Sequence, residues 1–133
     1  MSRVVVDTDV VSFLFKRHPF AFQYLPDLAN RTPLISFMTV AELDRWVLQA
    51  RWGEARRERL RHYLEPFAVL PYDRALCTKW AEITVAAQSR GIRIDCADAW
   101  IAATALLCDA PLITHNNSNY LGVPGLSLIS HAQ

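Results

Sequence analysis

The stretch DCADAWIAATALLCDAPLITHN, residues 95–116, predicts a helix of small residues, a turn and a short buried strand. Asp95 is suited to cap the helix, and Asp98 falls in its first turn, where a carboxylate faces the positive end of the helix dipole. The alanines that follow favour a helix and allow it to approach a sheet closely. Pro111 prevents the helix from continuing, so residues 112–114 are expected to form a strand.

A helix that leads through a short turn into a buried strand is half of a βαβ unit. Thr114, His115 and Asn116 then follow the strand at its carboxyl end. Open parallel sheets bind their ligands at this edge, so the same place is expected to hold a functional site.

The rest of the chain alternates short apolar strands with longer helices. Strands are expected at residues 3–7, 34–36, 67–70, 112–114 and 126–129, and helices at 10–15, 20–29, 39–51, 54–64, 74–90 and after Asp95. Thr39 and Glu42 match a capping box at the start of one of these helices. This order predicts an α/β fold with a mostly parallel central sheet flanked by helices. With 133 residues, the chain is expected to form a single domain, residues 1–133.

Composition excludes several classes of protein. The chain is 52% hydrophobic but has no apolar run long enough to span a membrane. Asp7 comes too early for the apolar region of a signal peptide, so a cytoplasmic location is expected. Cys77, Cys96 and Cys108 lack the spacing of a zinc site and are expected to be buried apolar residues.

Three acids occupy equivalent places in the predicted topology. Asp7 ends the first strand, Glu42 lies early in the helix after the second, and Asp98 lies early in the helix before the fourth. Each alone could be only a helix cap or turn residue. Together they should project from one edge of the sheet, where Asn116 could join them. Carboxylates so close repel by roughly several kcal/mol, so a compensating Mg²⁺ or Mn²⁺ ion is expected.

Four segments carrying these residues resemble a known family. VVVDT at 4–8, TVAEL at 39–43, DAWIAATAL at 98–106 and LITHN at 112–116, followed by Tyr120, are similar to a PIN domain. Within that family the chain most resembles the VapC ribonuclease toxins of type II toxin–antitoxin systems. The resemblance extends over nearly the whole chain.

The resemblance implies a site in which Asp7, Glu42, Asp98 and Asn116 take the places of the family's four acids. Many relatives have Asp where this chain has Asn116, so both one and two metal ions remain open. Thr114 corresponds to a family hydroxyl that orients the first Asp or a metal-bound water. Asp95 is either a helix cap or an auxiliary residue of the metal site.

The implied activity is a metal-dependent endoribonuclease toxin that hydrolyses RNA with a metal-activated water. Asp7 and Asp98 would bind Mg²⁺ directly, with Mn²⁺ as a substitute, and Glu42 would bridge to the ion or bind it through water. The implied substrate is tRNA or another structured RNA. The implied partners are a VapB-type antitoxin and a second copy of the chain.

Other interpretations remain open at the level of sequence. The chain could be a PIN-like module that binds RNA or protein without cutting, and the spacing of Asp7 and Asp9 also occurs in metal-dependent phosphatases.

The arginines between Arg51 and Arg61 could bind RNA phosphates, hold a protein partner, or form a solvated helix face with pairs such as Glu54–Arg57 and Glu58–Arg61. The many aromatic residues predict an apolar surface covered by another chain. These aromatics are Phe13, Phe15, Phe20, Phe22, Trp46 and Trp52.

Overall fold

A parallel sheet of five strands forms the centre of the fold in the computed structural model, which describes residues 2–133. The strands are β1 (Ser2–Val6), β2 (Arg31–Ser36), β3 (Ala68–Leu70), β4 (Leu112–Ile113) and β5 (Leu128–Ile129). Their order across the sheet is β3-β2-β1-β4-β5, and every neighbouring pair is parallel. The predicted α/β fold is confirmed, with β5 at an edge.

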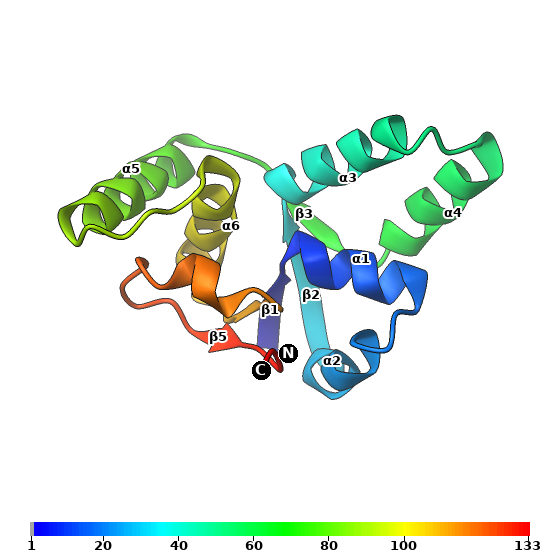
Figure 1. Cartoon of the computed structure of the whole chain (residues 1–133), viewed down its shortest axis with the longest axis horizontal. Helices are drawn as coiled ribbons and strands as arrows, with labels where there is room; N and C mark the ends of the chain where they lie inside the picture. The colour runs from blue at the N-terminus through cyan, green and yellow to red at the C-terminus, as the bar shows by residue number, and fades with distance from the viewer. Residues whose placement is uncertain (1) are drawn as a thin grey trace.

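Helices cover both faces of the sheet, as Figure 1 shows. They are α1 (Thr8–Lys16), α2 (Ala21–Leu28), α3 (Phe37–Gln49), α4 (Glu54–Leu64), α5 (Arg74–Ser89) and α6 (Cys96–Leu107), with a short 3₁₀ helix, η1 (Asn117–Tyr120). In Figure 1, α5 and α6 lie on one side of the sheet and α1 to α4 on the other. None of the helices in residues 2–133 is long and apolar enough to cross a membrane.

Successive side chains of the central strands point alternately to the two faces of the sheet, so an apolar core forms on each face. In β1, Val5 packs into the core beneath α5 and α6, whereas Val4 and Val6 pack into the core on the side of α1 to α4. In β4, Leu112 and Ile113 divide between the two cores in the same way. Successive strand side chains point to opposite faces, so a strand buried on both faces must be apolar at every position.

The chain reverses its direction of travel across the sheet between β1 and β4. From β1 it proceeds to β2 and β3 on one side, and later returns to β4 and β5 on the other. The Asp7 backbone N–H donates to the Ile113 carbonyl at 2.9 Å, which joins the carboxyl ends of the two central strands. Such a reversal leaves a crevice at the carboxyl ends, where ligands bind in open α/β sheets.

The predicted capping box at Thr39 is wrong. Helix α3 begins two residues earlier, and Ser36 is its N-cap, with the side chain accepting from Met38 N at 3.0 Å. A hydroxyl at the end of β2 thus caps the helix directly. Thr39 is fully buried inside the helix, and Glu42 is free of a capping role.

The three cysteines differ in exposure. Cys108 is buried as predicted, Cys77 is half-buried, and Cys96 is exposed at the start of α6. The prediction that all three are buried is therefore wrong for Cys96, because the first turn of α6 emerges at the surface.

Candidate active site

Asp7 is the buried centre of the site. It follows β1 directly and is the N-cap of α1, so both elements fix its position. Only 6% of it is exposed. Its Oδ1 accepts from Thr8 N at 2.8 Å, and its Oδ2 accepts from Thr114 Oγ1 and Tyr120 Oη, both at 2.8 Å. Three donors thus stabilise one carboxylate and fix its orientation.

Glu42 approaches the site from α3. Its Oε1 accepts a hydrogen bond from Thr8 Oγ1 at 2.7 Å, and Thr8 Oγ1 also lies 2.9 Å from the hydroxyl of Thr39. Thr8 follows Asp7 in the chain, so this hydroxyl pair couples the first turn of α1 to α3. Glu42 is consequently held beside Asp7.

Asp98 enters from the opposite side, in the first turn of α6. Tyr120 Oη lies 3.4 Å from Asp98 Oδ1 while donating to Asp7. The tyrosine is 2% exposed and belongs to η1, which follows the Thr114 strand end. One phenol therefore links two of the predicted acids, a role that the sequence did not reveal.

Asp9 is a fourth acid of the site. It lies in the first turn of α1, whose N-cap is Asp7, and its Oδ1 accepts from Val10 N at 2.7 Å. Its Oδ2 also accepts from His115 N and from Asn116 Nδ2, both at 3.1 Å. Asp9 therefore joins the start of α1 to the loop after β4, and this pairing holds Asn116 at the site.

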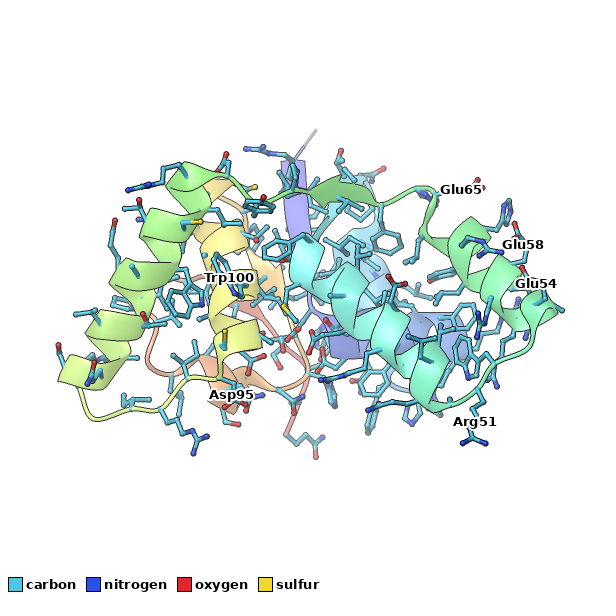
Figure 2. The ribbon with its side chains drawn as sticks, turned by 90° about the horizontal axis from the view of Figure 1, so that it is seen from above. Arg51, Glu54, Glu58, Glu65, Asp95 and Trp100 are labelled. Carbon is cyan, nitrogen blue, oxygen red and sulfur yellow. The ribbon has the colours of Figure 1, made fainter. Side chains whose placement is uncertain are left out.

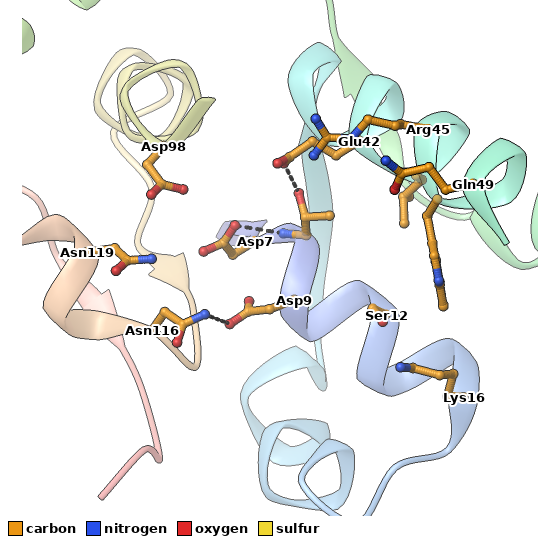
Figure 3. A pocket seen from close by; sticks show the side chains of 13 residues that line it. Asp7, Asp9, Ser12, Lys16, Glu42, Arg45, Gln49, Asp98, Asn116 and Asn119 are labelled. Atoms are coloured by element: carbon orange, nitrogen blue, oxygen red, sulfur yellow. Dashed lines mark hydrogen bonds between the residues drawn. The ribbon is translucent and has the colours of Figure 1, made fainter. Parts of the chain in front are cut away.

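The four acids and Asn116 line one open pocket, shown in Figure 3. The cavity has a volume of about 380 Å³ and is lined by Asp7, Asp9, Glu42, Asp98 and Asn116, among others. Thr114 lies beneath it, fully buried, where it donates to Asp7 and accepts from Asn116 N at 3.0 Å. The structure thus brings together every site residue expected from the sequence.

Burial and neighbouring negative charge raise the pKa of three of the pocket acids, Asp7, Asp9 and Asp98. Burial, followed by the negative charge of Asp7, raises the pKa of Asp9 to about 7. Burial and the charges of Asp7 and Asp95 raise the pKa of Asp98 to about 6. Burial also raises the pKa of Asp7, with a contribution from Glu42, against the opposing effect of its hydrogen bonds. No ion pair within residues 2–133 involves these pocket carboxylates.

The donors present fit a hydrated divalent cation. Carboxylate and amide oxygens are the ligands of Mg²⁺ and Mn²⁺, and nothing softer lines the pocket. No group of three His, Cys, Asp or Glu side chains in residues 2–133 is arranged to hold a metal ion alone. Mg²⁺ usually keeps several waters and takes only one or two carboxylates, so this arrangement suits it.

A protein-family model matches this chain over most of its length. The PIN domain model matches residues 4–125, which include every pocket acid. This chain belongs to the PIN domain family. Ribonuclease VapC4 of Mycobacterium tuberculosis is 33% identical to it over 98 residues, covering 72% of this chain and 75% of that protein. Plasmid stability protein StbB of Pseudomonas syringae pv. tomato is 30% identical and covers 96% of each chain.

Solved PIN domain structures share the fold over almost the full length. A chain in the structure of VapBC-1 from nontypeable Haemophilus influenzae superposes with a TM-score of 0.82 at 26% identity, covering 96% of this chain and 97% of that one. A chain of VapBC2 from Rickettsia felis, bound to a promoter DNA fragment, gives a TM-score of 0.85 at 24% identity, covering 96% and 98%. The recognition of the family from sequence is confirmed.

Asp95 and the predicted arginine cluster between Arg51 and Arg61 lie outside this PIN pocket. Asp95 is at the N-cap position of α6 (Figure 2) but makes no capping hydrogen bond, and its Oδ1 lies 3.8 Å from Arg93 Nε. On α4 the predicted Glu58–Arg61 pair is confirmed. The predicted Glu54–Arg57 pair is wrong, because Arg57 Nε donates to the Trp52 carbonyl and Glu54 pairs with Arg61.

The raised pKa values predict how the stability of the PIN domain depends on pH without metal. Asp9 and Asp98 have folded-state pKa values above the ordinary 3.8, so the folded state binds more protons than the unfolded state. Their contribution to stability is complete below about pH 4 and is lost as the pH rises through about 6 and 7. Thermal unfolding in EDTA should show the melting temperature of Asp9→Asn falling less steeply over this range than that of the parent. Parallel profiles would contradict the pKa assignment.

Tyr120→Phe removes one hydroxyl and keeps the buried ring. Asp7 then loses one of its donors, so RNA cleavage should fall about tenfold, the effect expected for a group that orients a ligand. Affinity for Mn²⁺, measured by calorimetry, should weaken in parallel while the circular dichroism spectrum stays unchanged. Tyr72→Phe, which removes an exposed hydroxyl that does not line the pocket, is the control. Equal Mn²⁺ affinity in the parent and Tyr120→Phe would show that the hydroxyl does not act on the site.

Proposed function

We propose that the chain is a metal-dependent endoribonuclease toxin that hydrolyses phosphodiester bonds in tRNA or another structured RNA. The observation that carries the proposal is the set of four carboxylates in one pocket, none of which forms an ion pair within residues 2–133, although Lys16 and Arg45 also line the pocket. A fold gains nothing from gathering such charges, since they repel. The named relatives are consistent with this function, since VapC4 carries the name ribonuclease.

Each residue has a distinct role in this proposal. Asp7 and Asp98 would hold a Mg²⁺ or Mn²⁺ ion, and Glu42 would bridge to it or bind it through water. Thr114 and Tyr120 keep Asp7 in a fixed orientation. Asn116 adds an amide without adding charge, which favours one tightly held ion over two. When bound, the ion lowers the pKa of water and offsets charge on the phosphate and leaving oxygen.

A VapB-type antitoxin is the proposed protein partner, and a second copy of the chain the proposed dimer partner. Structures of VapBC complexes superpose well on this chain. Apolar side chains are also left at the surface of α2, where Phe22 is 63% and Leu25 50% exposed. Of the six aromatics noted in the sequence, Phe20 and Phe22 are exposed, whereas Trp52 is buried. Exposed apolar patches of this kind mark surfaces that other chains cover.

Expression in bacteria followed by sequencing of RNA 5′ ends tests the proposed activity. The native chain should create new 5′ ends at a small set of sites, and Asp7→Ala should create none. Cleavage by purified protein should require Mg²⁺ or Mn²⁺ and stop in EDTA. A protein that binds RNA without producing new ends would instead be a non-cleaving module. Identical ends from Asp7→Ala would reject the mechanism.

A further inference from the structure

A second, larger cavity adjoins the carboxylate pocket. It has a volume of about 1060 Å³ and lies between the end of α1 and the exposed side of α4. Its lining includes Arg17, Arg56, Arg59 and His62. Lys16 lines both this cavity and the carboxylate pocket, so the two are continuous at that side chain.

Two tryptophans in contact hold cations along this route. The Lys16 Nζ atom lies 5.1 Å from the centre of the Trp46 ring, and the Arg56 Cζ atom lies 4.3 Å from that of Trp52. The two tryptophan rings themselves are 4.5 Å apart, edge to face. Cation–π contacts restrain long side chains while their N–H donors remain available to a ligand.

These cations have no acidic partner within residues 2–133, since no ion pair there involves Lys16, Arg17 or Arg56. Arg61, on the same helix as Arg56, differs because it pairs with Glu54 and Glu58, the two glutamates labelled on α4 in Figure 2. Glu58 also lines the groove, but its charge is offset by Arg61, so the unpaired Lys16, Arg17 and Arg56 leave the groove positively charged.

We propose that Lys16 and Arg56 bind successive backbone phosphates of the RNA strand whose scissile bond enters the carboxylate pocket. This inference rests on the proposed nuclease function. A pocket lined by carboxylates repels a polyanion, so a strand needs positive charge beside it to remain bound. Phe15 and Tyr63 also line the groove and offer ring faces for unpaired bases. This combination of cations and aromatics favours a single-stranded nucleic acid over an acidic protein segment.

Binding can be measured without cleavage in an Asp98→Asn background. Lys16→Met and Arg56→Met remove the charge and keep much of the stem, and Arg90→Met, at an exposed arginine after α5 that lines neither cavity, is the matched control. The probe is a short, fluorescein-labelled single-stranded RNA of mixed sequence, titrated by anisotropy at several KCl concentrations. Each test variant should bind about tenfold more weakly at low salt, with the salt slope reduced by about 0.7 per lost contact. Arg90→Met should match the parent in both affinity and salt slope.

Parent-like affinity and salt slope in Lys16→Met and Arg56→Met would overturn the proposal. It would also fall if both variants bound RNA normally but lost binding to an oligoglutamate peptide, since the groove would then serve an acidic protein segment. RNA cleavage is also measured in proteins that keep the native Asp98. This measurement distinguishes a failure of the phosphate contacts from a failure of the proposed nuclease function. Normal cleavage together with normal RNA binding by both variants rejects the phosphate contacts alone. If both variants bind RNA more weakly but the native chain does not cleave RNA, the nuclease function is rejected and the phosphate contacts are retained.

Discussion

Asp98→Asn should lower RNA cleavage about a thousandfold, because it removes a negatively charged oxygen that would hold the divalent ion in the proposed mechanism. The variant should remain folded, and its melting temperature in EDTA should exceed that of the parent near neutral pH. The raised pKa of Asp98, caused by burial and by neighbouring acids, shows that its charge opposes folding when no cation is present. Added Mn²⁺ should raise the melting temperature of the parent and have little effect on the variant.

Asp95→Asn is the matched control for this prediction. Asp95 lies one turn earlier on the chain, carries the same charge and does not line the pocket. It should therefore keep near-parental cleavage and its full stabilisation by Mn²⁺. Parental cleavage by Asp98→Asn, or equal loss in both variants, would contradict the assigned role of Asp98.

Thr114→Val is expected to have the second largest effect. It keeps the shape of the side chain but removes the hydroxyl that donates to Asp7 Oδ2 and accepts from Asn116 N. Because the buried Asp7 carboxylate then loses one of its three donors and Asn116 N loses its acceptor, the free energy of unfolding should fall by about 1–3 kcal/mol. RNA cleavage should fall about 10- to 100-fold, as is typical for a group that orients a metal ligand.

Thr104→Val separates the two consequences of this change. Thr104 is also buried, at 1% exposure, but its hydroxyl donates to the Trp100 carbonyl within α6. Its replacement should affect stability and leave cleavage per folded molecule unchanged. Urea unfolding and cleavage assays on both variants test this. A Thr114→Val enzyme as active as Thr104→Val would show that the hydroxyl serves only the fold.

The sheet and three acids of the site, Asp7, Glu42 and Asp98, were predictable because short-range sequence patterns determine them. Val4, Val5 and Val6 form an uninterrupted apolar run, which indicates a strand buried on both faces. Asp7 directly follows a strand, and Asp98 lies in the helix that precedes another strand. The parallel topology brings both positions to the same edge of the sheet. The bounds of α3 were less predictable, because Ser36 and Thr39 are both good caps and local sequence does not choose between them.

The remaining part of the site depends on contacts between distant segments. Asp9 satisfies a local capping pattern, so nothing in the sequence near it reveals its second oxygen's contacts with His115 and Asn116. Tyr120 lies beyond the predicted strand, and only the path of η1 returns its hydroxyl to Asp7. The spacing of Asp7 and Asp9 was the available signal for a fourth acid, but it was equally consistent with a cap.

Calorimetric titration of Mn²⁺ into the native chain and Asp7→Asn tests the central claim most directly. The account predicts that the native chain binds Mn²⁺ and that Asp7→Asn, with an unchanged circular dichroism spectrum, loses this binding. Equal Mn²⁺ binding by the two folded proteins would contradict it, because the buried carboxylate at the centre of the pocket would then have no part in holding the ion.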